Sequence, residues 1–300
     1  MRTLSTSRRR EAIAFYLCIG PWLLGFLLFA LGPMLISLYV SFTRYDLLTA
    51  PVWVGSENYR RMVRDPLFWH ALKVTAIYTA AYVPLELAGS LGLALLVRPK
   101  VAGVRVFRTL FYLPSVLAGV AYVVVWIWLL QPQGGLVNLL LAWFGIAGPR
   151  WLLDPHWALP ALVLMSFWGW GRSMVIYLAG LQTIPVELYE AAAIDGAGTW
   201  TRFWHVTLPL LSPTIFFSLV LSLINTFQTF TSAFVATNGG PLDATLFFVL
   251  YLYRRAFQFF DMGYASALAW VLFVIVMALT VLVFRTQRFW VFYSGERTDG

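Results

Sequence analysis

The sequence predicts an all-α membrane protein with six transmembrane helices. Hydrophobic residues make up 60% of the 300 residues and charged residues only 11%, whereas a typical soluble domain carries about 25% charged residues. So few charges could not cover the surface of a soluble protein of this size. The apolar residues also fall into long runs separated by polar segments, which is typical of helices that cross a bilayer.

The first predicted span follows a basic, polar tail, residues 1–11. No charged residue occurs from position 12 to 43, and we expect the span to end near Val40, with Trp22 and Tyr39 at the membrane interface. A secretory signal could also follow a basic tail. This apolar run is too long for one and no small-residue cleavage site follows it, so a retained span is predicted.

The next two spans are separated by a dense basic loop. An external segment, residues 44–73, leads to a second span from about position 74 to 97, which contains a single acidic residue, Glu86. Four of the eleven residues 98–108 are positively charged. The third span is predicted to begin near Phe107 and to end at the following QPQGG turn.

The C-terminal half contains three further spans. The apolar stretch 136–146 is too short to cross a bilayer of about 30 Å, which needs about 20 residues, so we expect a small helix at the external surface. Spans are predicted at about 157–181, with Arg172 inside, at 212–236 and at 263–284, where no charge occurs. These boundaries give a six-span transmembrane domain, residues 12–284, followed by a polar tail, residues 285–300.

The distribution of basic residues predicts the orientation of the chain. Six spans place both tails, the basic loop and the loop between spans four and five on one side of the membrane. Lys and Arg number 12 on that side and 8 on the other. The positive-inside rule therefore predicts a multi-pass protein of the cell membrane with both termini cytoplasmic.

The loop between spans four and five, residues 185–209, contains the most informative spacing. It is predicted to form two short helices: a helix with Glu187 in its first turn, a stop and a turn at Gly196 and Gly198, and a second helix capped by Thr199. Such a polar element between apolar runs would lie in water, where another protein can bind it. An ordinary solvated loop would explain this composition.

The spacing within the loop is more specific than its composition. A Glu-Ala-Ala triplet is followed six residues after the Glu by Gly, and a Leu-Pro pair comes later: Glu190, Ala191, Ala192, Asp195, Gly196, Leu208 and Pro209 carry this pattern, Asp195 through an Asp-Gly-Ala step. This pattern resembles the EAA loop of binding-protein-dependent ABC importer permeases. Val206 stands where that family usually has Ile, a departure that preserves shape and polarity.

Two further motifs resemble the carbohydrate subgroup of that family. One is a GxxNY and DPxFWxAL pattern in the first external segment, carried by Gly55, Asn58, Tyr59, Asp65, Pro66, Phe68 and Trp69. Lys73 and Val74 depart from the Asn-Thr that often follows it. The other is the TNGGP turn after the fifth span, residues 237–241.

The resemblance implies a type I ABC importer permease fold and a set of partners. These are a second, similar permease, two ATP-binding cassette subunits that bind the ATP, an external solute-binding protein, a sugar substrate and the lipid bilayer. The EAA loop would be a cytoplasmic coupling helix. A short helix with an acidic end and an apolar face formed by Ala191, Ala192 and Ile194 suits a groove in a soluble partner.

The sequence lacks the motifs of most catalytic sites. No GxxxxGK[ST] pattern occurs, and the chain has only two lysines, Lys73 and Lys100, so we expect no ATP hydrolysis by this chain. HExxH, GxSxG and CxxC patterns are also absent, the three histidines are expected in separate loops, and Cys18 is the single cysteine. No catalytic residue, bound metal, cofactor or nucleic-acid partner is predicted.

Polar residues inside spans are candidates for a substrate pathway, because each is costly in lipid unless it faces protein or water. Counted from the EAA loop and the TNGGP turn, the pocket positions implied by the resemblance are Met165, Gly169, Arg172, Asn225, Thr226 and Thr229. The family commonly has amide or aromatic groups at these places. Met165 and Arg172 are departures, so the sequence does not identify the sugar. We take Gly169, Arg172, Asn225, Thr226 and Thr229 as pathway residues.

Other interpretations of these residues remain open. Serine and threonine hydroxyls in spans often bond to their own helix, Glu86 and Arg172 lie at matching depths and could neutralise each other, and Trp168 and Trp170 could serve helix packing. Arg172 also suits an importer of an anionic solute such as glycerol phosphate, while a polyamine importer is a further alternative. An ion-driven carrier or a membrane enzyme is less favoured, because the sequence shows no internal repeat and no clustered catalytic set.

Overall fold

The computed structural model describes residues 3–98, 103–117 and 119–292, which fall into two compact units. Unit 1 comprises Met1–Asp65 and Leu252–Val271, and unit 2 comprises Pro66–Tyr251 and Leu272–Gly300. Within the described ranges, five helices are long and apolar enough to cross a membrane, and a sixth results if a bent helix pair counts as one span. The all-α membrane fold predicted from the sequence is confirmed.

Unit 1 is built around the first span. Helix α1 (Thr3–Phe26), a π-helical turn (Leu27–Leu31) and helix α2 (Gly32–Ser41) follow one another without interruption. The remaining elements are strand β1 (Thr43–Arg44), which pairs antiparallel with β2 (Val52–Trp53), helix α3 (Glu57–Arg64), a π-helical turn (Arg254–Gln258) and the first part of helix α15 (Met262–Thr286).

The GxxNY motif holds the segment after the first span in place. The buried amide of Asn58 donates hydrogen bonds of 2.8 Å to the carbonyl oxygens of Ser41 and Thr43, and the Tyr59 hydroxyl lies 2.8 Å from Ser41 Oγ. Gly55 has φ +60°, a conformation that glycine adopts without steric cost. The motif therefore caps the end of α2 and positions α3.

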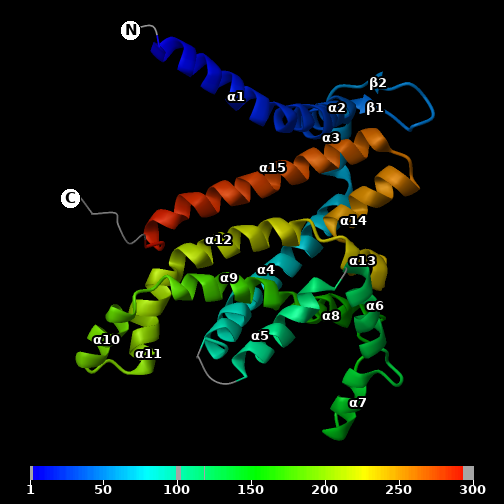
Figure 1. Cartoon of the computed structure of the whole chain (residues 1–300). Coiled ribbons are helices and arrows are strands. Elements are labelled where there is room, and N and C mark those ends of the chain that lie inside the picture. Colours follow the sequence, from blue (N-terminus) through cyan, green and yellow to red (C-terminus); the bar gives the residue numbers. More distant parts are fainter. Residues whose placement is uncertain (1–2, 99–102, 118, 293–300) are drawn as a thin grey trace. The chain divides into compact units, whose positions relative to one another are not determined.

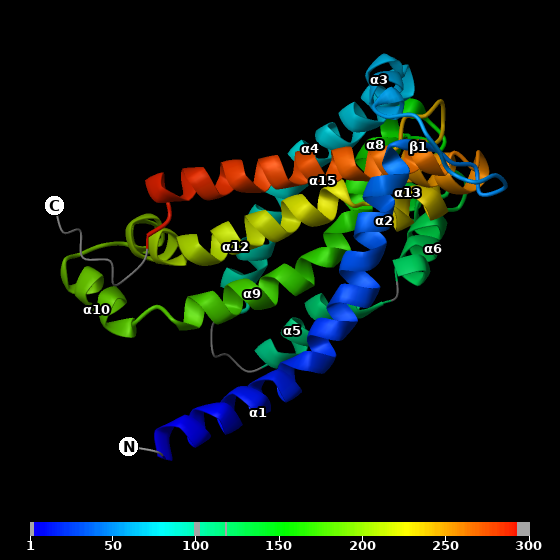
Figure 2. The ribbon, with the colours of Figure 1, turned by 90° about the horizontal axis from the view of Figure 1, so that it is seen from above.

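Unit 2 consists of helices that surround a central group of three. Its elements are α4 (Pro66–Leu96), α5 (Val104–Tyr112), α6 (Gly119–Leu129), α7 (Leu136–Trp143), α8 (Pro155–Ser166), α9 (Trp170–Gln182), α10 (Val186–Ile194), α11 (Thr199–Arg202), α12 (Leu208–Phe227), α13 (Thr231–Ala236), α14 (Phe248–Tyr253, which ends in unit 1) and the second part of α15. Helices α4, α9 and α12 pack against one another, and both views show α9 and α12 side by side (Figure 1 and Figure 2).

Small residues allow these helices to approach closely, as is common in membrane proteins. Gly89 of α4 lies directly under the ring of Trp170, so the packing role expected for this tryptophan is confirmed. Gly180 of α9 faces the side chain of Thr214, and Gly171 faces the backbone carbonyl of Phe111 in α5. Each glycine thus marks a helix crossing that leaves no room for a larger residue.

Two predicted span boundaries are wrong. The second span begins at Pro66, eight residues earlier than expected, and the fifth ends at Phe227 instead of residue 236. Helix α13 follows as a separate element after a non-helical break at residues 228–230. The sequence around this break, Asn-Thr-Phe-Gln-Thr at residues 225–229, contains asparagine and threonine, which have low helix propensity and whose side chains compete for backbone hydrogen bonds.

The third span is not one straight helix. Helix α5 with its 3-10 turn (Leu113–Val116) is bent by 101° from α6. Pro114 in that turn lacks an N–H donor, and Leu117, directly after the turn, has extended backbone that ends the helix. The predicted basic loop includes Lys100, which lies outside the described residues, as do Arg2 and Arg297 of the predicted tails.

The predictions for the other elements are confirmed in the described residues. The fourth span, Pro155–Gln182, and the sixth, α15, lie where we expect them. The QPQGG segment forms a turn, and the apolar stretch after it is the short helix α7.

Candidate functional site

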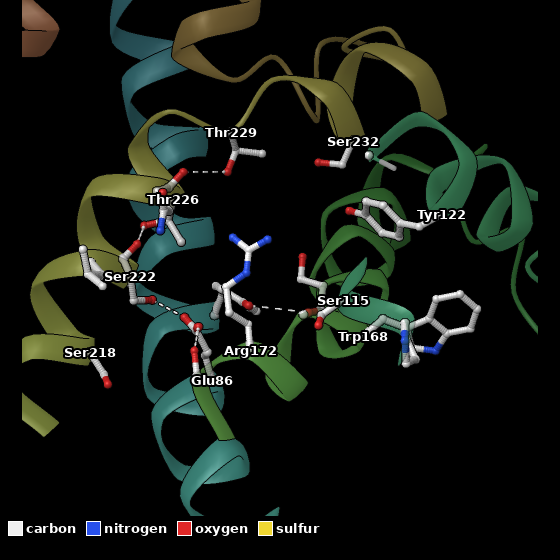
Figure 3. A pocket seen from close by; sticks show the side chains of 18 of the residues that line it. Glu86, Ser115, Tyr122, Trp168, Arg172, Ser218, Ser222, Thr226, Thr229 and Ser232 are labelled. Atoms are coloured by element: carbon white, nitrogen blue, oxygen red, sulfur yellow. Dashed lines mark hydrogen bonds between the residues drawn. The ribbon is translucent and has the colours of Figure 1, made fainter. Parts of the chain in front are cut away.

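A polar cavity of about 410 Å³ lies within unit 2. This volume is in the range of small-molecule sites, about 300–1,000 Å³. The residues that line it come from α4, α6, α8, α9, α12 and α13, from the turns before α6 and α9, and from the break after α12 (Figure 3): Tyr78, Tyr82, Glu86, Pro114, Ser115, Leu117, Gly119, Tyr122, Ser166, Trp168, Gly169, Arg172, Ser173, Ile176, Ser218, Leu221, Ser222, Asn225, Thr226, Thr229 and Ser232.

The structure brings all five predicted pathway residues to this cavity: Gly169, Arg172, Asn225, Thr226 and Thr229. Met165, the sixth position implied by the resemblance, is 0% exposed and does not line the cavity. The local backbone explains why Met165 is absent from the lining. The 3-10 turn Phe167–Gly169 between α8 and α9 turns Gly169 and Arg172 toward the cavity, while Met165 stays on the packed face of α8.

Glu86 and Arg172 do not form the ion pair that their depths suggest. Within the described part of the chain no ion pair joins them, although both line the cavity. The Glu86 carboxylate instead accepts hydrogen bonds from Ser173 Oγ, at 2.7 Å, and from Ser222 Oγ. Figure 3 shows the Arg172 guanidinium pointing into the cavity, between Thr229 and Ser115 and away from Glu86.

The hydroxyl groups of Thr226 and Thr229 are only partly free for a ligand. Thr226 Oγ1 donates to the carbonyl of Ser222 at 2.9 Å, and Thr229 Oγ1 donates to the carbonyl of Asn225 at 3.5 Å. Both hydroxyls therefore bond to backbone carbonyls of α12, which is one of the interpretations that the sequence left open. A hydroxyl oxygen that donates one hydrogen bond can still accept others. The Asn225 side chain is exposed and makes no hydrogen bond to any described residue.

The aromatic and carboxylate side of the cavity was not anticipated as a site. Tyr78, Tyr82 and Glu86 are spaced four residues apart on α4, so they share one face of that helix. Tyr78 and Tyr82 stack with ring centroids 5.7 Å apart, and Tyr78 OH lies 2.5 Å from Ser166 Oγ. This spacing of polar residues within an apolar span was the signal that could have identified them.

Trp168 has both a packing and a lining role. Its ring lies 5.2 Å from that of Trp126 and its side chain also reaches the cavity. The contact with Trp126 agrees with the helix-packing interpretation of Trp168, and the cavity lining adds a second role. Tyr122 adds a second aromatic ring on the same side (Figure 3).

The EAA segment forms a helix, a glycine turn and a second helix at one end of unit 2, beyond the ends of α9 and α12 (Figure 2). Glu190, Ala191 and Ala192 lie on α10. The backbone N–H groups of Gly196 and Ala197 donate to the carbonyls of Ala193 and Ala192, at 3.1 and 2.8 Å, which closes the helix in a Schellman motif. Gly196 has φ +79°, as that motif requires.

The remaining motif residues flank these helices. Asp195 caps the C-terminus of α10, and Leu208 and Pro209 begin α12. Thr199 is the first residue of α11 and makes no capping hydrogen bond; the preceding Gly198 occupies the cap position, so the predicted cap is wrong. A glycine serves at this position nearly as well as threonine.

One residue, Tyr189, anchors the loop to the helices below it. Its hydroxyl lies 3.0 Å from Thr207 Oγ1, and the guanidinium carbon of Arg98 lies 4.7 Å from the centre of its ring. The ring also packs against a buried apolar cluster that contains Met174 and Leu211. The loop is therefore joined to α4, α9 and α12.

The outer surface of the loop is exposed and partly apolar. Ile194 is 87% exposed and Trp200 is 72% exposed, and Glu190 and Asp195 are exposed beside them. Exposed large apolar side chains that gather with polar ones are typical of protein interaction sites. The loop thus presents a surface that another protein can bind.

No second site with catalytic chemistry is evident in the described residues. The histidines lie on separate helical elements and not in loops as expected: His70 on α4, His156 on α8 and His205 in the π-helical turn before α12. Among the residues that the structure describes, no group of three or more His, Cys, Asp or Glu side chains could hold a metal ion.

A bundle of apolar helices around a polar cavity, with an exposed helical loop at one end, defines a membrane transport subunit. Residues 98–291 match the family of binding-protein-dependent transport system inner membrane components. The chain belongs to this family.

Individual relatives resemble the chain over nearly its whole length. It is 46% identical over 297 residues to the probable ABC transporter permease protein YesP of Bacillus subtilis, covering 97% of this chain and 96% of YesP. It is 36% identical over 292 residues to the lactose transport system permease protein LacF of Rhizobium radiobacter, covering 95% of this chain and 97% of LacF. Its fold is similar to a solved bacterial ABC transporter involved in the import of the acidic polysaccharide alginate, with a TM-score of 0.83, 24% identity and coverage of 95% and 98%.

Proposed function

We propose that the chain is the permease subunit of an ATP-driven importer that moves a saccharide across the cell membrane. The observation that carries this proposal is the polar cavity among α4, α9 and α12, in a chain whose relatives include a lactose permease. Hydroxyl, amide and aromatic side chains dominate the lining, and these groups suit the hydroxyls and ring faces of a sugar. The chain itself takes no part in ATP hydrolysis.

The coupling proposal concerns the exposed loop. We assign the surface formed by Glu190, Ile194 and Trp200 as the place where an ATP-binding cassette subunit docks. Tyr189 then transmits the movement of that subunit to α4, α9 and α12. The Schellman turn at Gly196 supports this assignment, because it keeps α10 as a short rigid helix that can enter a groove of the partner.

The proposed assembly contains further subunits. Apolar side chains remain exposed on the helices around the cavity, for example Val175 of α9 and Phe217 of α12, so lipid or a second permease must cover them. A second permease of similar fold would complete the pathway. An external solute-binding protein would deliver the saccharide, as the family description implies.

Co-purification tests the coupling proposal directly. Tagged wild-type chain, expressed with its operon partners and purified in mild detergent, is expected to retain an ATPase and a second permease. Glu190→Ala is expected to weaken retention of the ATPase, while Glu57→Ala, a change of an exposed acid in unit 1, leaves it unchanged. A chain that purifies alone in both cases contradicts the importer assignment.

Orientation is tested by reporters. We propose that both termini and the EAA loop are cytoplasmic, since the basic residues are concentrated on that side. A reporter fused after Gly300 should score as internal, and one inserted in the turn at residues 131–135 should score as external. The opposite pair of results would place the EAA loop out of reach of any cytoplasmic ATPase.

An importer of another solute is the alternative that the cavity favours most, because Arg172 suits an anion such as glycerol phosphate. Uptake assays with neutral and with phosphorylated ligands distinguish the saccharide importer from this alternative. Uptake that survives loss of the ATPase and collapses with an uncoupler would instead support an ion-driven carrier.

A further inference from the structure

The two charged side chains of the cavity have different surroundings. Glu86 is held by the hydroxyl groups of Ser173 and Ser222, one from α9 and one from α12. Arg172 has no hydrogen bond and no ion pair to any described residue, and its side chain is exposed. The carboxylate thus has protein partners and the guanidinium does not.

A guanidinium without a partner inside a transmembrane helix needs an explanation. Charged residues in spans are costly and face a water-filled cavity or a partner. Arginine stays charged at all physiological pH values and presents its donors in a planar fork. Figure 3 shows this fork directed into the open part of the cavity, where the neighbouring labelled side chains, Ser115, Tyr122 and Thr229, are uncharged.

The planar fork matches one class of ligand group particularly well. Two parallel N–H donors bind the two oxygens of a carboxylate, and the charged pair is roughly twice as strong as a neutral hydrogen bond. The exposed amide of Asn225 lies on α12, close in sequence to Thr229 in the break that follows this helix, and can bind sugar hydroxyls. The cavity therefore offers an anion-binding group beside groups suited to a sugar ring.

We propose that the transported substrate is an acidic saccharide, and that Arg172 binds its carboxylate or sulfonate group. This inference rests on the proposed function of the same cavity. Glu86 lies on the side of Ser222 and Ser173, so its charge is directed into two hydroxyl hydrogen bonds and not toward the space in front of Arg172 (Figure 3). Arg172 is then a specificity-determining residue.

The test uses matched saccharides in proteoliposomes that contain the complete importer with its binding protein and internal ATP. Three series differ at carbon 6 only, carrying a carboxylate, a sulfonate or a hydroxyl group. The neutral series is obtained by reducing uronate oligosaccharides, so ring stereochemistry and linkage are retained. Initial uptake rates over a range of concentrations give the ratio of kcat/KM for each acidic saccharide to that for its neutral counterpart.

The expected result is preferential uptake of an acidic series by the wild type. Arg172→Gln should lower the acidic-to-neutral ratio about tenfold or more, the effect of losing a hydrogen bond to a charged group. Arg172→Lys should retain part of the ratio. Arg150→Gln, a change of an exposed arginine outside the cavity, is the matched control and should have no effect.

A double variant separates substrate recognition from a purely internal role. If Arg172 only balanced the charge of Glu86, Glu86→Gln combined with Arg172→Gln would restore acidic uptake. We expect no such restoration. Restoration, an equal loss of acidic and neutral uptake in Arg172→Gln, or a wild-type preference for the neutral series would each overturn the inference while leaving the importer function intact. If neither acidic nor neutral saccharides enter with ATP, the proposed function itself fails.

Discussion

Replacing Gly171 by alanine tests the packing on which the cavity depends. A Cβ atom at this position would lie 2.1 Å from the carbonyl oxygen of Phe111 and 2.9 Å from the Cα of Tyr112. Both are backbone atoms in the last turn of α5, so no side-chain rotation can relieve the overlap. Because ordinary contacts of a Cβ atom begin near 3.4 Å, α5 and α9 would have to separate by about 1 Å.

The energetic cost follows from that separation. Overpacking of this kind costs about 1–3 kcal/mol, and the better helix propensity of alanine returns about 0.5–1 kcal/mol. The difference is a net destabilisation of about 0–2.5 kcal/mol, and we expect the upper part of this range because the overlap is with backbone atoms. Since the turn after α5 contributes Pro114 and Ser115 to the cavity, substrate affinity should fall as well.

Two other glycines provide matched controls. At Gly169 an added Cβ would meet only the Tyr82 hydroxyl, at 3.7 Å, and at Gly92 it would meet no atom within 4 Å. Thermal unfolding in detergent, followed by size-exclusion fluorescence, should show Gly171→Ala well below the wild type, Gly169→Ala close to it, and Gly92→Ala equal to it or above. A Gly171→Ala protein as stable as Gly169→Ala would refute the close crossing of α5 and α9.

Three further variants probe the loop and the end of the first span. Gly196→Ala imposes a side chain at φ +79°, which costs about 1–2 kcal/mol; ATPase retention should weaken, with a small fall in the unfolding temperature of the purified chain, and Gly92→Ala, outside the loop, should leave retention intact. Tyr189→Phe removes the hydrogen bond to Thr207 and keeps the ring, so ATP hydrolysis should become partly uncoupled from uptake; wild-type stoichiometry would contradict this. Asn58→Ala leaves two backbone carbonyls without their donor, at about 1–3 kcal/mol, and should expose residues 42–56 to protease; an unchanged cleavage pattern would count against the anchoring role of Asn58.

Local chemistry explains which parts could be predicted from the sequence. The glycine turn at Gly196 was predictable because the end of a helix depends on a few adjacent residues. Asn225, Thr226 and Thr229 were identifiable because polar groups within a span must face protein or water. These inferences need no knowledge of how the helices are rotated about their axes.

The remaining features depend on tertiary packing. Glu86 and Arg172 lie at similar depths in their predicted spans, which suggested an ion pair. Depth does not determine how each helix is rotated about its axis, and the observed rotation places Ser173 and Ser222 against the carboxylate. Counting residues back from the EAA loop placed Met165 in the pocket. The 3-10 turn after Met165 changes which residues face the cavity.

The hydrogen bonds of Glu86 also have a mechanical consequence. The Glu86 carboxylate on α4 accepts one hydrogen bond from Ser173 on α9 and one from Ser222 on α12, so it links three helices at the cavity wall. Any rotation of α12 against α4 has to break a hydrogen bond to a charged group, about 1.5–3 kcal/mol, unless a sugar hydroxyl or a water molecule takes the place of the serine. An occupied cavity would therefore release the helices more easily than an empty one, which ties the movement of the wall to the presence of cargo.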